Sequence, residues 1–210
     1  MERYFGLHNH TMYSNIRLLD CINRPKDLID KAIELGLSGI AITDHECLSG
    51  HMEVNQYAQK IKEKHPDFKI ALGNEIYLVD ERENGIKYYH FILIAKDAIG
   101  HKALRELSST AWYHSYVDRG MERVPITKSE LATVMSNYKG HVIASTACMG
   151  GELSTNAYAM DLAEEVNDLL TQKVGEGTYS KEELDQMFED VQAGQIVDGT
   201  IDVSKLKDNV

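Results

Sequence analysis

The sequence predicts an α/β protein, and three observations support this class. Short β-rich runs alternate with helical stretches through residues 1–150. The run at 39–43 is apolar on both faces, as in a parallel strand buried under helices. Side chains able to bind metal fall mostly at or near the carboxyl ends of the predicted strands, where the active sites of such folds gather. We therefore expect a parallel sheet or a barrel with its site at one mouth.

The first part of the chain supplies two strand–helix pairs. A short strand is expected at 3–7 and a helix at 25–35, where a proline opens the helix and a glycine closes it. The apolar face of this helix consists of Leu28, Ile29, Ala32, Ile33 and Leu35. After the strand at 39–43, a second helix is expected at 50–64, and it stops before Pro66.

A hairpin and two further helices follow. Strands at 69–79 and 88–95 are separated by a polar turn, which predicts that they pair as a hairpin. Apolar residues at helical spacing predict a long helix at 99–116. The sequence TKSE resembles a capping box that opens a helix at 127–136, and a last apolar strand is expected at 140–145.

Composition divides the chain into three expected segments. We predict a main domain at 1–155, an additional amphipathic helix at 156–171, and an acidic appendage, insertion or mobile tail at 172–210. Residues 161–210 hold 13 acidic residues against 4 lysines, whereas residues 1–160 hold 20 acidic and 18 basic residues. Most of the net charge of −11 therefore lies in residues 161–210. This charge distribution is unlike that of a protein that binds nucleic acid by itself. If the chain acts on DNA, other segments or subunits must supply the DNA-binding contacts.

The composition also bears on the compartment. No apolar run approaches the roughly 20 residues needed to cross a bilayer, and the first residues do not resemble a signal peptide. Three widely spaced cysteines argue against a disulfide framework and fit a reducing compartment. We expect a cytoplasmic protein with no membrane partner.

Several side chains could bind metal together. His8 and His10, two residues apart on an extended chain, present both imidazoles on one face, which suits zinc or manganese. Asp20 and Glu75 would add carboxylate oxygens, and Cys148 a thiolate. A mixed set of this size suggests two or three ions close together. Such ions favour phosphoester hydrolysis, because they activate water and stabilise both oxygens of a phosphoryl transfer.

Each part of this pattern also has a purely structural explanation. The pair at Thr43 and Asp44 often only closes a strand or caps the following helix. Cys148 could equally be a small buried apolar residue. The remaining histidines are expected to be surface or hydrogen-bonded residues without a role: His51, His65, His101, His114 and His141. The order of the whole set along the predicted strands favours the metal hypothesis more strongly than any single motif does.

The motifs HNHT, ITDH and GNE resemble the first three motifs of the polymerase-and-histidinol-phosphatase (PHP) superfamily. The stretches YHFILIAKDAIGHKALRELSSTA and HVIASTACMGGEL look like the amino-terminal PHP domain of the alpha subunit of bacterial DNA polymerase III, including phage types. The resemblance implies a distorted seven-stranded β/α barrel, incomplete here at its C-terminal end, with up to three zinc, manganese or iron ions. It assigns the metal-ligand positions to His8, His10, Asp20, His45, Glu75, His90 and Cys148.

The resemblance further implies a function in DNA replication. Such a domain can act as a metal-dependent 3′–5′ exonuclease, with DNA and other replisome subunits as its partners. Asp44, His45 and Glu75 are the expected catalytic positions, and Asp44 is expected to orient the neighbouring imidazole. Two alternatives stay open: a stand-alone phosphoesterase acting on a small phosphate monoester, and a non-catalytic module that metal stabilises.

Two departures from the family pattern shape the expectation of activity. The spacing from His10 to Asp20 is longer than usual, and Asn15-Ile16-Arg17 looks like an insertion. The family's last motif, Asp-x-His, is absent from all 210 residues. We therefore expect an amino-terminal piece of a larger polymerase, a split gene product or an expression fragment, with weak or no exonuclease activity by itself.

Overall fold

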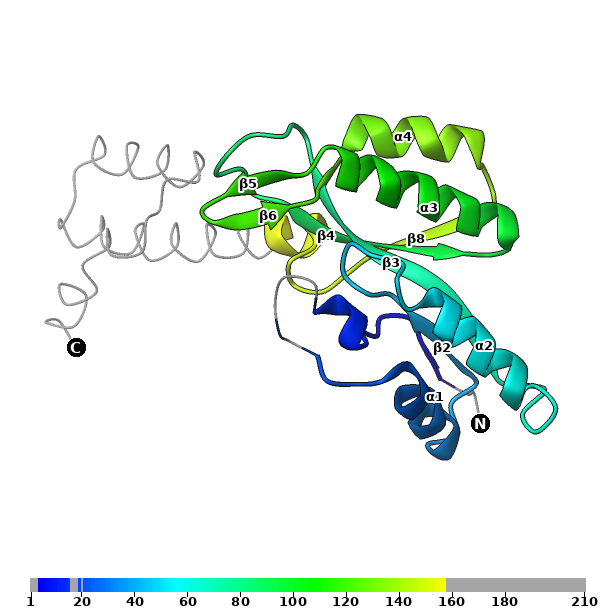
Figure 1. Cartoon of the computed structure of the whole chain (residues 1–210). Coiled ribbons are helices and arrows are strands. Elements are labelled where there is room, and N and C mark those ends of the chain that lie inside the picture. Colours follow the sequence, from blue (N-terminus) through cyan, green and yellow to red (C-terminus); the bar gives the residue numbers. More distant parts are fainter. Residues whose placement is uncertain (1–3, 16–18, 20, 158–210) are drawn as a thin grey trace, which may run out of the picture. The chain divides into compact units, whose positions relative to one another are not determined.

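The computed structural model describes residues 4–15, 19 and 21–157, in which strands and helices alternate (Figure 1). The strands are β1 (Phe5–Gly6), β2 (Gly39–Ile42), β3 (Lys69–Val79), β4 (Tyr89–Ala95), β5 (Tyr116–Asp118), β6 (Met121–Arg123), β7 (Ile126–Thr127) and β8 (Val142–Thr146). The helices are the 3-10 turn η1 (Met12–Ser14) and α1 (Pro25–Glu34), α2 (His51–Ile61), α3 (Ala98–Tyr113) and α4 (Lys128–Asn137).

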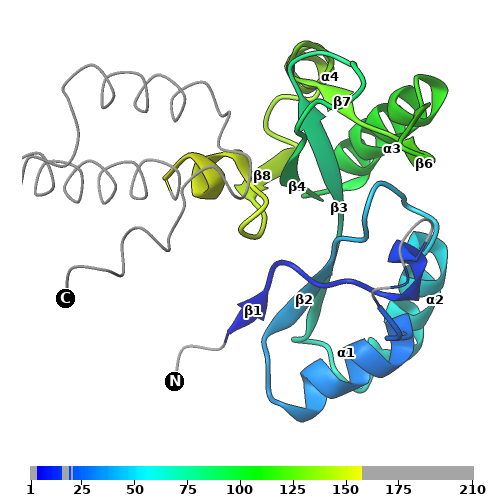
Figure 2. The same cartoon turned by 90° about the vertical axis from the view of Figure 1, so that its left-hand side faces the viewer.

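The main sheet has six strands, in the order β1-β2-β3-β4-β8, with β7 also beside β3. The first three strands are parallel, whereas β3 and β4 form the expected antiparallel hairpin and β8 is antiparallel to β4. The long strand β3 joins the two parts, because Lys69–Leu72 pairs with β2 and Gly73–Leu78 pairs with β4 (Figure 2). The α/β prediction is confirmed. In the described residues β1 and β8 do not pair, so the sheet is a curled half-barrel and not a closed barrel.

The two faces of β3 differ, because side chains alternate along a strand. Ile70 and Leu72 pack in the core beneath α1 and α2, and Ile76 and Leu78 pack in the core beneath α3 and α4. Burial of these apolar faces is what holds the helices against the sheet. The alternate positions of β3, from Ala71 through Glu75 to Tyr77, face away from the helices. The polar residue Glu75 therefore projects from the other, inner face of the half-barrel.

The helix boundaries differ from the expected ones by a few residues, and one face assignment was wrong. Leu35, expected on the apolar face of α1, is 64% exposed, because the helix ends at Glu34 and Gly36 follows with a φ of 72°. The long helix α3 ends at Tyr113 instead of residue 116, where β5 begins. Strands β5, β6 and β7 were not predicted, since two or three residues are too few to show an alternating pattern.

The expected segments beyond the main domain are largely outside the described residues. The chain divides into two units, Met1–Ser154 and Thr155–Val210. Residues 152–157 are helical, and 158–210, which hold most of the expected amphipathic helix and the whole acidic tail, are not described. The three-segment division therefore stays a prediction.

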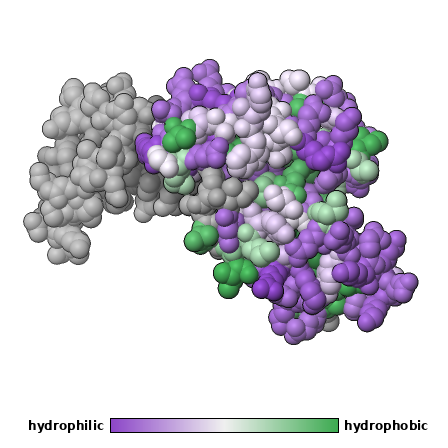
Figure 3. Space-filling model, in the orientation of Figure 1, coloured by the Kyte–Doolittle hydropathy of each residue, from purple (hydrophilic) through white to green (hydrophobic). Residues whose placement is uncertain are grey.

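The face of the molecule shown in Figure 3 is mostly hydrophilic over the described residues, with hydrophobic side chains in small separate groups. Within the described chain, no helix has the length and apolar character needed to cross a membrane.

The expected capping box is present: the Thr127 side chain accepts from the Glu130 backbone N–H, and the Glu130 carboxylate accepts from the Thr127 N–H. Its hydrogen bonds fix the start of α4.

Candidate metal centre

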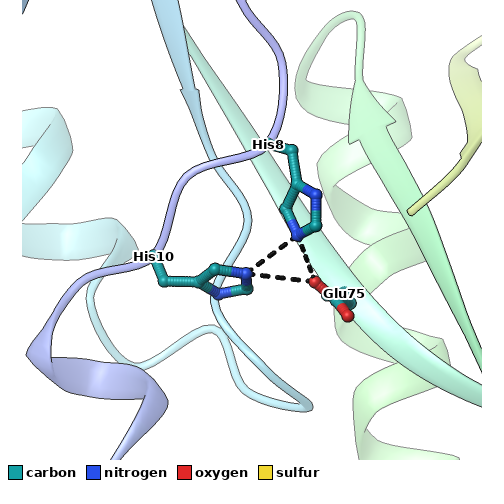
Figure 4. A group of neighbouring side chains, drawn as sticks. All are labelled: His8, His10 and Glu75. Carbon is teal, nitrogen blue, oxygen red and sulfur yellow. Dashed lines mark hydrogen bonds and ion pairs between the residues drawn. The ribbon is translucent and has the colours of Figure 1, made fainter. Parts of the chain in front are cut away.

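His8 and His10 lie just after β1 and point toward the same carboxylate. His8 Nε2 is 2.5 Å from Glu75 Oε2, His10 Nε2 is 3.1 Å from the same oxygen, and the two nitrogens are 2.9 Å apart (Figure 4). The pairing of β1 with β2 and of β2 with β3 brings this segment beside the middle of β3. Residues 67 positions apart in the sequence are therefore in direct contact.

His45 and His90 approach the other oxygen of Glu75. His90 Nδ1 is 2.5 Å from Oε1, and His45 Nδ1 is 3.7 Å from it. His45 follows β2 and forms an isolated parallel bridge with Glu75, which fixes its distance from β3. His90 is placed by the β3–β4 register, in which it pairs with Tyr77. The four imidazoles thus come from three different segments of the sheet.

Glu75 is completely buried and stays ionised. Burial by itself would raise the pKa of its carboxyl. The imidazoles of His10, His8 and His90 outweigh this effect and hold the pKa of Glu75 well below its usual range, with a further contribution from His45. A permanently negative carboxylate at the centre of four imidazoles is suited to bind cations.

The donor set fits two metal ions that share this carboxylate. Two groups of three side chains in the described residues have ligand atoms within 4.8 Å of one another: His8, His10 and Glu75, and His45, Glu75 and His90. Glu75 Oε1 is buried and makes no hydrogen bond, although a nitrogen lies 2.5 Å away. Imidazole nitrogens and carboxylate oxygens are the usual ligands of zinc and related divalent ions. An oxygen without a hydrogen bond that faces imidazoles would be available to bind a metal ion.

Asp44 is not in either group but supports one of the ligands. It is buried, and its oxygens accept hydrogen bonds from the Thr11 N–H (2.6 Å), the Thr11 hydroxyl (2.8 Å) and the Ser14 hydroxyl (2.8 Å). Because the Ser14 hydrogen points to Asp44, Ser14 Oγ can accept from His10 Nδ1 at 3.2 Å. This chain fixes the His10 tautomer that leaves Nε2 without a proton and free to bind a metal.

Asn74 holds the loop after β2 against β3, a contribution that the sequence reasoning missed. Its side-chain amide donates to the backbone carbonyl oxygens of Asp44 (2.8 Å) and Cys47 (3.1 Å), and it is 1% exposed. The backbone N–H groups of Glu75 and Glu46 add cross-strand bonds on both sides of His45. The only sequence signal was its position, since Asn74 and Glu75 must lie on opposite faces of one strand.

Of the two remaining predicted ligands, the structure describes only Cys148. Cys148 is exposed, and its Sγ lies 3.5 Å from His90 Nδ1, so it is at the edge of the cluster without belonging to either group of three. Asp20 is outside the described residues. Two of the histidines that were assigned no role contact one another: His51 Nδ1 and His101 Nε2 are 3.0 Å apart, away from Glu75.

The family model for the PHP domain matches residues 6–190, which is most of the chain. The chain belongs to the PHP domain family. A probable DNA polymerase of Bacillus subtilis (YorL) and a DNA-directed DNA polymerase of Bacillus phage SPbeta are each 42% identical to this PHP domain over 174 residues, 78% of this chain. The DNA polymerase III alpha subunit of Borreliella burgdorferi is 31% identical over 176 residues, 80% of this chain.

This PHP domain covers only a small part of these relatives. It spans 13% of the length of the two Bacillus-related polymerases and 14% of the Borreliella subunit. Among solved structures, a proposed metal-dependent phosphoesterase from Bifidobacterium adolescentis matches with a TM-score of 0.37 and 23% identity, over 54% of this chain and 36% of that one. The family model and the polymerase relatives confirm the sequence resemblance to the PHP superfamily and to polymerase alpha subunits.

Proposed function

We propose that this PHP domain binds two divalent metal ions and that it hydrolyses phosphoesters. The observation that carries the proposal is the shared carboxylate: each oxygen of Glu75 faces its own pair of imidazoles. His8 and His10 would hold one ion with Oε2, and His45 and His90 the other with Oε1. Cys148 and Asp20 are the candidates for further ligands, including those of a third ion.

The chain's own residues would prepare the centre for this chemistry. When bound, paired divalent ions lower the pKa of water and offset the negative charge of a phosphoryl group. Glu75, held ionised, would supply negative charge to both ions. Asp44 and Ser14 orient His10, and Asn74 keeps the segment carrying His45 at a fixed distance from β3. Zinc, manganese and iron all suit this mixture of nitrogen and oxygen ligands.

The finer proposal is a 3′–5′ exonuclease within a replicative polymerase. The support is the similarity of this chain to DNA polymerases, which are enzymes that act on DNA. On this proposal the partners are DNA and other replisome subunits, the compartment is the cytoplasm, and residues 1–155 are the metal-binding domain. We expect weak activity from this chain, because an Asp-x-His motif is absent from its sequence.

Metal content and turnover test the proposal together. Elemental analysis of the purified chain should find about two equivalents of zinc, manganese or iron, and His10→Ala should lower this number. A 5′-labelled oligonucleotide incubated with Mn²⁺ should be shortened from its 3′ end by the wild type and not by His10→Ala.

Other outcomes separate the alternatives. Turnover of a chromogenic phosphate monoester without any action on DNA would favour a small-molecule phosphoesterase. Bound metal without turnover of either substrate would favour a structural module. A chain that holds none of these metals at any stoichiometry would contradict the whole proposal.

A further inference from the structure

An aromatic surface extends from the metal centre along the inner face of β3 and β4. Tyr77 stacks on His90 with ring centroids 4.7 Å apart, and on Tyr88 at 4.6 Å. Tyr88 and His90 are nearly parallel, at 12°, with centroids 6.2 Å apart, and both are half-buried. Tyr77 is almost completely buried and supports the other two rings. Two partly exposed rings are thus held side by side, and one of them belongs to the metal centre.

The positively charged side chain of Arg123 lies at the outer end of this surface. The Arg123 guanidinium on β6 lies 5.3 Å from the centroid of the Tyr88 ring, and its Nη1 donates to the Tyr88 hydroxyl at 3.0 Å. In the described part of the chain Arg123 forms no ion pair with a carboxylate, in contrast to Arg82, which is paired with Glu130. Arg123 therefore keeps further N–H donors and its full positive charge for a ligand.

The β5–β6 hairpin does not need Arg123 for its attachment to the rest of the domain. The Tyr116 hydroxyl on β5 donates to the Glu83 carbonyl oxygen at 3.1 Å, and the Gly85 N–H donates to Asp118 at 3.4 Å. Two other contacts therefore fasten the hairpin to the turn between β3 and β4. A purely structural role leaves unexplained why the cation is placed beside a half-buried ring next to the metal centre.

We infer that Tyr88 and Arg123 bind a nucleotide of a single-stranded polynucleotide, next to the phosphate that would lie at the metal centre around Glu75. The inference rests on the proposed phosphoesterase function and adds the residues that select this substrate. Aromatic side chains stack on bases of any sequence, and arginine adds cation–π and phosphate contacts. A phosphate monoester without a base offers Tyr88 no ring to stack on.

Binding and turnover in the full chain test this inference. The probe is a fluorescein-labelled single-stranded oligonucleotide with hydrolysis-resistant phosphorothioate links, measured by fluorescence anisotropy with Mn²⁺ and with chelator. Tyr88→Ala and Arg123→Ala should each raise the Kd ~fivefold or more, and Tyr88→Phe should retain most of the affinity because the ring remains. Tyr113→Ala, which removes a highly exposed tyrosine at the end of α3, is the matched control and should have no effect.

The outcomes distinguish this inference from the proposed function. Supporting results are weaker binding in both alanine variants and normal binding by Tyr88→Phe and Tyr113→Ala. If the wild type hydrolyses no ester but its binding still depends on Tyr88 and Arg123, the proposed function fails and the inference stands. The inference is overturned if both alanine variants bind like the wild type, if Tyr113→Ala weakens binding equally, or if the wild type does not bind the oligonucleotide in either condition.

Discussion

Ser14 orients the imidazole of His10, a candidate metal ligand. Its hydroxyl donates to Asp44 and can accept from His10 Nδ1, and it also accepts the His45 backbone N–H at 3.2 Å. One side chain thus touches a buried carboxylate and segments carrying two candidate ligands. Groups of this kind, which contact the ligands and not the metal, typically change metal affinity by 10–100-fold.

Replacing Ser14 by alanine should weaken metal binding without unfolding the domain. We expect Ser14→Ala to raise the Kd for Mn²⁺ about tenfold, since His10 loses the partner that fixes its tautomer. Isothermal titration of metal-free protein measures this change. Ser136→Ala is the control, because Ser136 is exposed and bonds only within the region of α4. Equal affinities for Ser14→Ala and the wild type would show that His10 is oriented by other groups.

Among the contacts that hold elements together, the hydrogen bonds of Asn74 attach the segment after β2 to β3. Asn74→Ala removes both donated hydrogen bonds and leaves the Cys47 carbonyl oxygen without this donor, whereas the Asp44 carbonyl still accepts from the Glu75 N–H. We expect the free energy of unfolding to fall by about 1–3 kcal/mol, measured by urea denaturation of metal-free protein. Asn55→Ala, an exposed site on α2, should change it little. Comparable stabilities of the two variants would contradict the role assigned to Asn74.

His51 links the start of α2 to β3 and α3. Its Nε2 donates to the Gly73 carbonyl oxygen at 2.9 Å, and its Nδ1 lies beside His101, which in turn lies beside Arg105. Burial lowers the pKa of His51 from 6.5 to about 4, with repulsion by His101 adding to the effect. The folded state therefore binds this proton less readily than the unfolded state does.

This difference predicts how stability depends on pH. The contribution of neutral His51 is fully present above about pH 6.5 and is lost as the pH falls from there toward about 4. Between pH 7 and pH 5 the wild type should lose about 2 kcal/mol more of its free energy of unfolding than His51→Gln loses. Urea denaturation at both pH values measures this, and the other histidines are common to both proteins. Parallel losses in the two proteins would contradict a buried, neutral His51.

For the molecule as a whole, bound metal should act as a stabilising ligand. Anything that binds the folded state alone raises the melting temperature by mass action. We expect chelator to lower the melting temperature of the wild type, and we expect the variant with both His8→Ala and His10→Ala to begin lower and to respond less. Scanning fluorimetry with and without added Mn²⁺ makes the comparison. A melting temperature that is the same with metal and with chelator would contradict a metal centre in this fold.

The order of the elements was predictable from local pattern. The strand at 69–79 and the capping box at 127–130 were predicted with the observed bounds, since a long apolar run and a Thr-x-x-Glu sequence are local signals. The short strands β5, β6 and β7 were not, because their pairing depends on neighbours that lie far away in the sequence. Leu35 was assigned to the wrong face, because one residue beyond a helix end no longer follows the helical period.

The sequence by itself determined the α/β class, the PHP family and the identity of the side chains that could hold metal. These follow from spacing and motif, which are properties of the linear chain. Only the tertiary structure decided that Glu75 lies between two pairs of histidines, that Asp44 acts through Ser14, and that Tyr88 and Arg123 extend the site. The physical reason is register: the pairing of β2 and β4 with β3 sets which distant side chains share the inner face, and no local pattern specifies that pairing.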